Sequence, residues 1–125
     1  MTGLAALIGM ACFGWLTLFQ VMLAAGLPLG RLAWGGAHRV LPQRLRLSSA
    51  VSALLTLAGL VIVSQAGGYI LVLPASWIVP GLWVYTAIFC LSFVANLFGA
   101  TGEERLHGVA ATSLCVMSTV ILAVE

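Results

Sequence analysis

The chain has 125 residues, of which 62% are hydrophobic and 6% charged, and its formal net charge is +2. Soluble domains carry roughly a quarter charged residues, so this composition excludes an ordinary soluble fold. Lipid offers the backbone no hydrogen-bond partners, so spanning segments must be helices or closed barrels. Continuous apolar runs without polar alternation predict helices.

Four apolar segments follow one another, at residues 3–27, 47–66, 78–99 and 107–124, and none contains Asp, Glu, Lys or Arg. Each is close to the ~20 residues that a helix needs to cross a hydrocarbon layer. We therefore expect an all-α membrane protein, with residues 1–125 forming a single four-helix transmembrane bundle. The first segment has no basic region before it, so it is expected to be a retained span and not a signal peptide.

The connection at 28–46 is the basic one, because it carries four of the five arginines, at positions 31, 39, 44 and 46. Cytoplasmic loops collect Arg and Lys, which predicts that this connection is cytoplasmic and that both termini are extracytoplasmic. Its six candidate contacts for anionic lipid headgroups or a partner protein are Arg31, Trp34, His38, Arg39, Arg44 and Arg46. Alternatively, these charges only set topology or bind an anionic substrate.

Local signals place turns and caps around this connection. Pro28 is expected to end the first helix, and Leu29, Leu32 and Ala33 to form one turn in the membrane interface beside Trp34. Ser48 or Ser49 is a candidate cap for the second span. On the opposite side, residues 67–77 either lie in the interface after a break at Gly67-Gly68 or extend the second helix to about Leu73.

Polar side chains inside the spans mark a possible intramembrane site, at Gln20, Ser52, Thr56 and Asn96. Ser48, Ser52 and Thr56 are four residues apart and form one stripe, which is expected to face other helices. Gln20 and Asn96 approach the same depth, so they either share a hydrogen bond or Asn96 caps the cytoplasmic end. In the first span, Ala5 and Gly9 form a small-xxx-small pair that permits close approach of another helix.

The last connection holds a possible acid–base cluster of Glu103, Glu104 and His107, near which His38 would lie if the connections touch. The spacing matches no motif, and Thr101 with Glu104 also fits a helix capping box. We expect these groups at the cytoplasmic surface, with no metal and no cofactor. Cys12, Cys90 and Cys115 have similar predicted depths, and packing explains them better than a redox pair.

No ionisable group is expected deep in the membrane, which disfavours a proton-coupled transporter. No phosphate loop, nucleophile elbow or zinc signature occurs, and the basic connection is too short for nucleic-acid binding.

The run from Ala25 to Arg46, which includes Pro28-Leu-Gly30 and Trp34-Gly35-Gly36-Ala-His38-Arg39-Val-Leu-Pro42, resembles a group of small bacterial four-span integral membrane proteins. Ala95-Asn96-Leu97 and Glu104-Arg105 extend the resemblance over nearly the whole chain. It implies a four-helix, multi-pass protein of the bacterial inner membrane, and it implies no activity.

These observations favour a non-enzymatic protein that binds membrane lipid, or a membrane-protein partner such as a second copy, through its helix faces and basic connection. The alternative is a membrane-embedded enzyme or binding protein for a small apolar molecule held near Gln20, Asn96 and the cytoplasmic His and Glu residues. A third possibility is an oligomeric channel or passive transporter.

Overall fold

The chain folds into four long helices joined by short connections. The computed structural model describes residues 2–33, 38–100 and 102–125, except for the side chain of Arg31. The helices are α1 (Thr2–Ala24), α2 (Gln43–Ala66), α3 (Ile78–Gly99) and α4 (Gly102–Val124), with 3₁₀ turns η1 (Gly30–Leu32) and η3 (Ala75–Trp77). No strand occurs among these residues. The prediction of an all-helical, four-helix architecture is confirmed.

All four helices are long and apolar enough to cross a membrane. They contain 22 to 24 residues, which at 1.5 Å per residue exceeds a hydrocarbon thickness of about 30 Å. The protein is therefore a multi-pass membrane protein.

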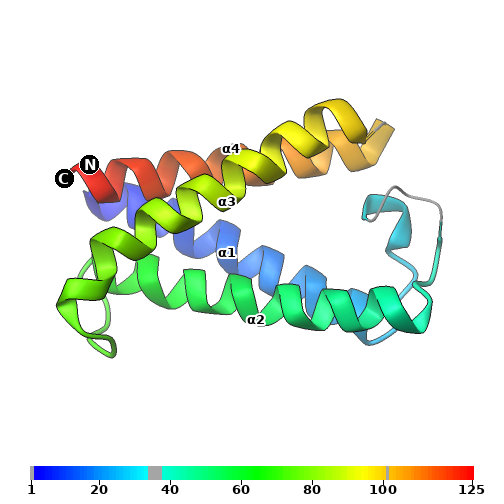
Figure 1. The fold of residues 1–125 in the computed structure, drawn as a ribbon, viewed down its shortest axis with the longest axis horizontal. Helices are drawn as coiled ribbons and strands as arrows, with labels where there is room; N and C mark the ends of the chain where they lie inside the picture. The colour runs from blue at the N-terminus through cyan, green and yellow to red at the C-terminus, as the bar shows by residue number, and fades with distance from the viewer. Residues whose placement is uncertain (1, 34–37, 101) are drawn as a thin grey trace.

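The helices form an elongated bundle with both termini at one end (Figure 1). The connection between α2 and α3 lies at the same end, and the other two connections lie at the opposite end. α1 packs against α2 and α4, and α3 packs against α4. α2 and α3 are close where they are joined and diverge toward the other end (Figure 1), which separates the α1–α2 pair from the α3–α4 pair there.

Hydroxyl groups that are buried or half-buried connect neighbouring helices. Thr17 Oγ1 donates to Thr56 Oγ1 (2.9 Å), the hydroxyls of Thr86 and Thr119 bond each other (2.8 Å), and Ser118 Oγ donates to the carbonyl of Ala5 (2.8 Å). In a membrane there is little hydrophobic drive between helices, so such bonds and close packing hold the bundle together.

The small residues at the start of α1 form its contact with α4. Gly9 lies so close to Ser118 that a Cβ added to this glycine would be 2.2 Å from Ser118 Oγ. Ala5 is buried and accepts the Ser118 hydrogen bond. The predicted use of Ala5 and Gly9 in a close helix contact is confirmed.

Three helix ends differ by more than one residue from the predicted span ends. α1 ends at Ala24, before Pro28, because Gly26 adopts a positive φ of 93°. α2 begins at Gln43 and α4 at Gly102, because polar residues continue each helix beyond its apolar segment. The proposed capping by Ser48 or Ser49 is therefore wrong. Ser48 lies inside α2, where its Oγ donates to the Arg44 carbonyl.

The 67–77 connection is a folded loop and not an extension of α2. The helix ends at Ala66, and Gly68 takes a positive φ of 84°. The side chain of Gln65 then holds the loop, since its Oε1 accepts from the amides of Val72 and Leu73 and its Nε2 donates to the Leu73 carbonyl (2.7–3.0 Å). The alternative of a longer second helix is thus excluded.

Candidate ligand cavity at the arginine-bearing end

Residues of both the α1–α2 pair and the α3–α4 pair line a cavity of about 290 Å³. It lies at the end of the bundle where the two pairs separate (Figure 1). All four helices and the η1 segment contribute to it. Its lining is Leu16, Phe19 and Gln20 of α1, Leu32 and Ala33, Ser52 of α2, Ser92 and Asn96 of α3, and Glu104, His107 and Gly108 of α4. The structure thus brings together five residues that the sequence placed in two separate groups: Gln20, Ser52, Asn96, Glu104 and His107.

Glu104 is the charged residue of this cavity, and it is only 6% exposed. The prediction that all acid–base groups lie at the surface is therefore wrong for Glu104. α4 begins at Gly102, so Glu104, His107 and Gly108 fall on one helical face, three and four residues apart, and that face points inward. Glu103, next in the chain, is exposed. Thr101, the proposed cap, lies outside the described residues.

Gln20 has a buried side-chain oxygen, Oε1, for which the described part of the protein offers no hydrogen-bond partner. Asn96 donates its Nδ2 to the Ser92 carbonyl (2.8 Å), and its side chain lies against Gly108. The proposed hydrogen bond between Gln20 and Asn96 is therefore not formed, although both residues line the cavity. A buried amide oxygen without a partner is costly.

His107 is held by two aromatic residues of α1 that the sequence reasoning did not select. Trp15 Nε1 donates to His107 Nε2 (2.8 Å), and the Phe19 ring centroid is 4.7 Å from that of His107. A nitrogen that accepts a hydrogen bond carries no proton, so this bond assigns His107 as neutral, with its proton on Nδ1. The four-residue spacing of Trp15 and Phe19 was the available signal, because it places both rings on one helix face.

The η1 segment covers the end of the cavity. Leu32 and Ala33 line it, and Ala33 packs with Phe19, Leu23 and Leu41 in a small apolar cluster. The amide of Gly30 donates to the carbonyl of Arg39 (2.9 Å), which ties the two ends of the connection together. The predicted turn near Leu32 exists, but it packs over the bundle.

Two of the predicted intramembrane residues differ in role. Ser52 lines the cavity, whereas Thr56 is one turn further into the bundle. Thr56 is 6% exposed, donates to carbonyls of its own helix and accepts from Thr17. Thr56 therefore packs against α1 and is not available to line a pore between copies.

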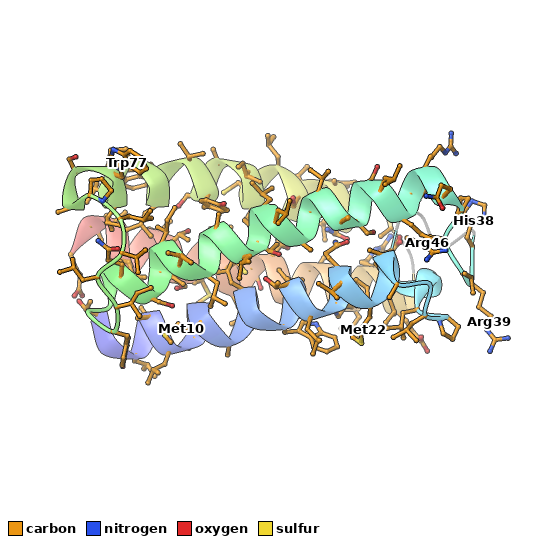
Figure 2. The ribbon with its side chains drawn as sticks, turned by 90° about the horizontal axis from the view of Figure 1, so that it is seen from below. Met10, Met22, His38, Arg39, Arg46 and Trp77 are labelled. Carbon is orange, nitrogen blue, oxygen red and sulfur yellow. The ribbon has the colours of Figure 1, made fainter. Side chains whose placement is uncertain are left out.

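The described arginines and His38 lie at this end of the bundle and do not line the cavity. His38 and Arg39 are exposed and, with Arg46, lie at the end far from Trp77 (Figure 2). Arg44 is exposed as well. Trp34 and the side chain of Arg31 lie outside the described part of the chain. Exposed arginines at one end are suited to anionic headgroups.

Arg46 lies at this end of the bundle too, and its side chain also contacts the end of α1. Its Nε donates to the carbonyl of Ala24 (2.9 Å), the last residue of α1, and its guanidinium lies beside Gly26. α1 has no basic residue in its own last turn, so a side chain from α2 satisfies this carbonyl and offsets the negative end of the helix dipole.

Replacing Arg46 with alanine is expected to lower the stability of the bundle by about 1–2 kcal/mol, since a hydrogen bond from a charged group is lost. Arg44→Ala removes the same charge from an exposed position and should change stability by less than about 0.5 kcal/mol. Thermal unfolding in detergent measures both. Equal effects of the two substitutions would show that Arg46 acts only through its charge.

The three cysteines do not come together at one place in the bundle. Cys12 of α1 and Cys115 of α4 pack in the same core cluster, whereas Cys90 is exposed on α3. Among the described residues, no three His, Cys, Asp or Glu side chains are placed to hold a metal ion.

No protein family, curated protein or solved structure matches this chain. The cavity therefore provides the basis for a functional assignment.

Proposed function

We propose that this protein binds a small amphiphilic molecule in the membrane, with the polar end of that molecule in the cavity at the arginine-bearing end. The convergence of polar side chains from all four helices on one cavity carries this proposal, because Gln20, Ser52, Asn96 and His107 could each form a hydrogen bond with a ligand placed there. The buried side-chain oxygen of Gln20 has no hydrogen-bond partner in the described part of the protein. Without a ligand or an ordered water nearby, its burial is energetically unfavourable.

The shape and composition of the cavity support binding. Its volume of about 290 Å³ is at the lower edge of the range for ligand sites, roughly 300–1,000 Å³. Apolar residues of α1 and η1 lie beside a few convergent polar groups, which is the usual composition of such a site. The arrangement favours the binding-protein hypothesis over the channel, since Thr56 is buried within one chain.

The position and orientation in the cell are part of the same proposal. We place the protein in the bacterial inner membrane, as a member of the small four-span group that its basic connection resembles. The arginine-bearing end would face the cytoplasm, in agreement with the distribution of Arg. Reporter fusions at residues 1 and 125 test this orientation and should both report an extracytoplasmic location.

The binding function is tested by a pair of neighbouring substitutions on α2. Ser52→Leu fills the cavity, whereas Val51→Leu changes a residue that is 67% exposed on the adjacent face. Native mass spectrometry after purification in mild detergent, covering lipids and small molecules, measures what is retained. We expect Ser52→Leu to reduce retention roughly tenfold, equivalent to about 1.4 kcal/mol, and Val51→Leu to behave as wild type.

Equal retention in wild type, Ser52→Leu and Val51→Leu would refute a cavity ligand. That result would instead support the first hypothesis, in which only the helix faces and the basic connection contact lipid.

A further inference from the structure

An apolar groove follows the seam between α3 and α4, on a surface separate from the cavity. Its deeper part is a hollow of about 370 Å³, lined by Cys90, Phe93 and Val94 of α3 and by Ser113, Val116 and Met117 of α4. The part nearer the arginine-bearing end is a hollow of about 380 Å³, lined by Leu97 of α3 and by residues near the start of α4 that include Arg105 and Leu106. None of these residues lines the cavity.

The two hollows form one groove because they follow one another along the same helix faces. Leu97 comes three residues after Val94 on α3, and Val109 comes four residues before Ser113 on α4. Residues at these spacings lie one turn apart on one face. α3 and α4 pack against each other, which keeps the two faces side by side.

The groove is as long as one leaflet of a bilayer. Gly102 at its outer end and Met117 at its inner end are 15 residues apart on α4, which corresponds to ~22 Å along the helix. Half of a bilayer of about 40–45 Å, headgroups included, has the same thickness. The groove therefore extends from the headgroup level at the arginine-bearing end to about the middle of the membrane.

The deeper part of the groove is suited to hydrocarbon. Ser113 is its hydroxyl-bearing residue, and the Ser113 Oγ donates to the Ala110 carbonyl of its own helix (2.9 Å). Apolar side chains beside it are open to the membrane, since Leu106 is 74% and Met117 56% exposed. An acyl chain in the seam would contact both helices at once, and such close packing is what favours association within lipid.

Arg105 gives the outer end of the groove a positive charge. It is the fourth residue of α4 and is exposed. Its Nε donates to the Ala100 carbonyl just beyond α3 (3.0 Å), which uses one of the five N–H donors of the guanidinium. Among the described residues that line the groove, Arg105 is the charged one.

The carboxylates near Arg105 in sequence lie on other sides of α4. Glu103 comes two residues earlier, and residues two apart on a helix do not face each other. Glu104 lines the cavity instead. A phosphate beside Arg105 would therefore meet a cation that can form charge-assisted hydrogen bonds with it.

We propose that this groove binds one anionic phospholipid, with the phosphate on Arg105 and one acyl chain along the seam between α3 and α4. The charge at the outer end, the apolar lining and the length of one leaflet all match such a lipid. The site is independent of the cavity and its ligand, and it lies outside the basic connection at 28–46.

The same charge disfavours a second copy of the chain as the occupant. In a dimer with its two-fold axis along the membrane normal, the same surface of each copy forms the interface. The two Arg105 side chains would then lie at one depth beside each other, and like charges repel. A lipid phosphate brings the opposite charge to this position.

The first test compares lipids that differ only in the headgroup. The full chain in mild detergent is mixed with equal amounts of dipalmitoyl phosphatidylglycerol, phosphatidylethanolamine and phosphatidylcholine, and native mass spectrometry records which lipids stay bound. We expect phosphatidylglycerol to be retained at least fivefold over both others. Equal retention of the three lipids would overturn the proposal.

Substitutions of arginine locate the headgroup contact. Arg105→Gln should lower phosphatidylglycerol retention about fivefold, whereas Arg105→Lys, which keeps the charge, should lower it less than twofold. Arg44→Gln removes the same charge from the basic connection and should also lower it less than twofold. Equal losses for Arg105→Gln and Arg44→Gln would mean that the arginines act collectively, and equal losses for Arg105→Gln and Arg105→Lys would assign the effect to the Ala100 hydrogen bond. Either result contradicts the proposed site.

A pair of phenylalanine substitutions locates the acyl chain. Ser113→Phe fills the deeper part of the groove and should lower retention of dipalmitoyl phosphatidylglycerol about fivefold. It should leave the dioctanoyl lipid unaffected, because tails half as long end before Ser113. Leu91→Phe changes a residue of α3 that is 73% exposed and lines neither groove nor cavity, and should have no effect on either lipid. Undiminished retention in Ser113→Phe would overturn the groove as the acyl-chain site.

The remaining outcomes separate this site from its alternatives. A lipid-free dimer that dissociates in Ser113→Phe would show that a second copy occupies the groove, and the proposal would be wrong. If Ser52→Leu lowers phosphatidylglycerol retention as much as Arg105→Gln does, the lipid belongs to the cavity and the groove proposal fails while the binding function stands. The headgroup comparison uses the wild-type chain, so it remains decisive if a variant folds poorly.

Discussion

Gly9→Leu is expected to cost the bundle about 3 kcal/mol of stability, at the upper end of the range for over-packing a core. The reason is the absence of space between α1 and α4. A single added Cβ at Gly9 would be 2.2 Å from Ser118 Oγ and 3.1 Å from Ser118 Cβ. The helices would have to separate, and the hydrogen bond from Ser118 to the Ala5 carbonyl would be lost.

Gly14→Leu is the control for this prediction, because an added Cβ at Gly14 meets nothing within 4 Å. It should leave stability unchanged or raise it slightly, since leucine favours helix more than glycine does. Thermal unfolding in detergent, followed by size-exclusion chromatography of the remaining folded protein, measures both. Similar losses for the two variants would mean that glycine is needed in α1 for its backbone and not for helix packing.

A double substitution tests the contact itself. Gly9→Ala alone should destabilise, and Ser118→Gly removes the atoms with which the new methyl group collides. If the contact is as described, Gly9→Ala should cost less in the Ser118→Gly background than in the wild type. An equal cost in both backgrounds would place the effect of Gly9 elsewhere.

The features predicted well from the sequence are those that depend on long apolar segments or on local spacing. In lipid, an apolar segment of about 20 residues forms a helix because its backbone groups have no other hydrogen-bond partners. The four helices could therefore be predicted from composition. The pair Ala5 and Gly9 is a local pattern, and the structure uses it against α4. Positive φ at Gly68 ends α2 where Gly67-Gly68 indicated a break.

The cavity could not be predicted because its residues come together only through packing. Glu104 was expected at the surface, since charged residues near a helix end usually are. Its burial depends on α4 beginning five residues before the apolar segment, and polar residues give no hydropathy signal for such a start. Likewise, Gln20 and Asn96 are close in depth, but the divergence of α2 and α3 opens a cavity beside them.

Gly30→Ala is expected to displace the η1 segment, which covers the end of the cavity. The amount of bound amphiphile retained after purification should fall roughly tenfold, equivalent to about 1.4 kcal/mol. An added Cβ at Gly30 would be 1.8 Å from the backbone oxygen of His38 and 2.8 Å from that of Arg39. A backbone oxygen cannot rotate away as a side chain can, so the two ends of the connection must move apart. Leu32 and Ala33, which line the cavity, would move with them.

Hydrogen–deuterium exchange over residues 29–33 measures this displacement without reference to any ligand. The Gly30 amide bonds the Arg39 carbonyl, so its exchange should accelerate in Gly30→Ala, while native mass spectrometry records the loss of bound amphiphile. Gly99→Ala, at the same end of the bundle and with nothing within 4 Å of the added methyl group, should change neither. Faster exchange with undiminished retention would show that the ligand is held by the helices alone, because the cover would then have moved without consequence for binding.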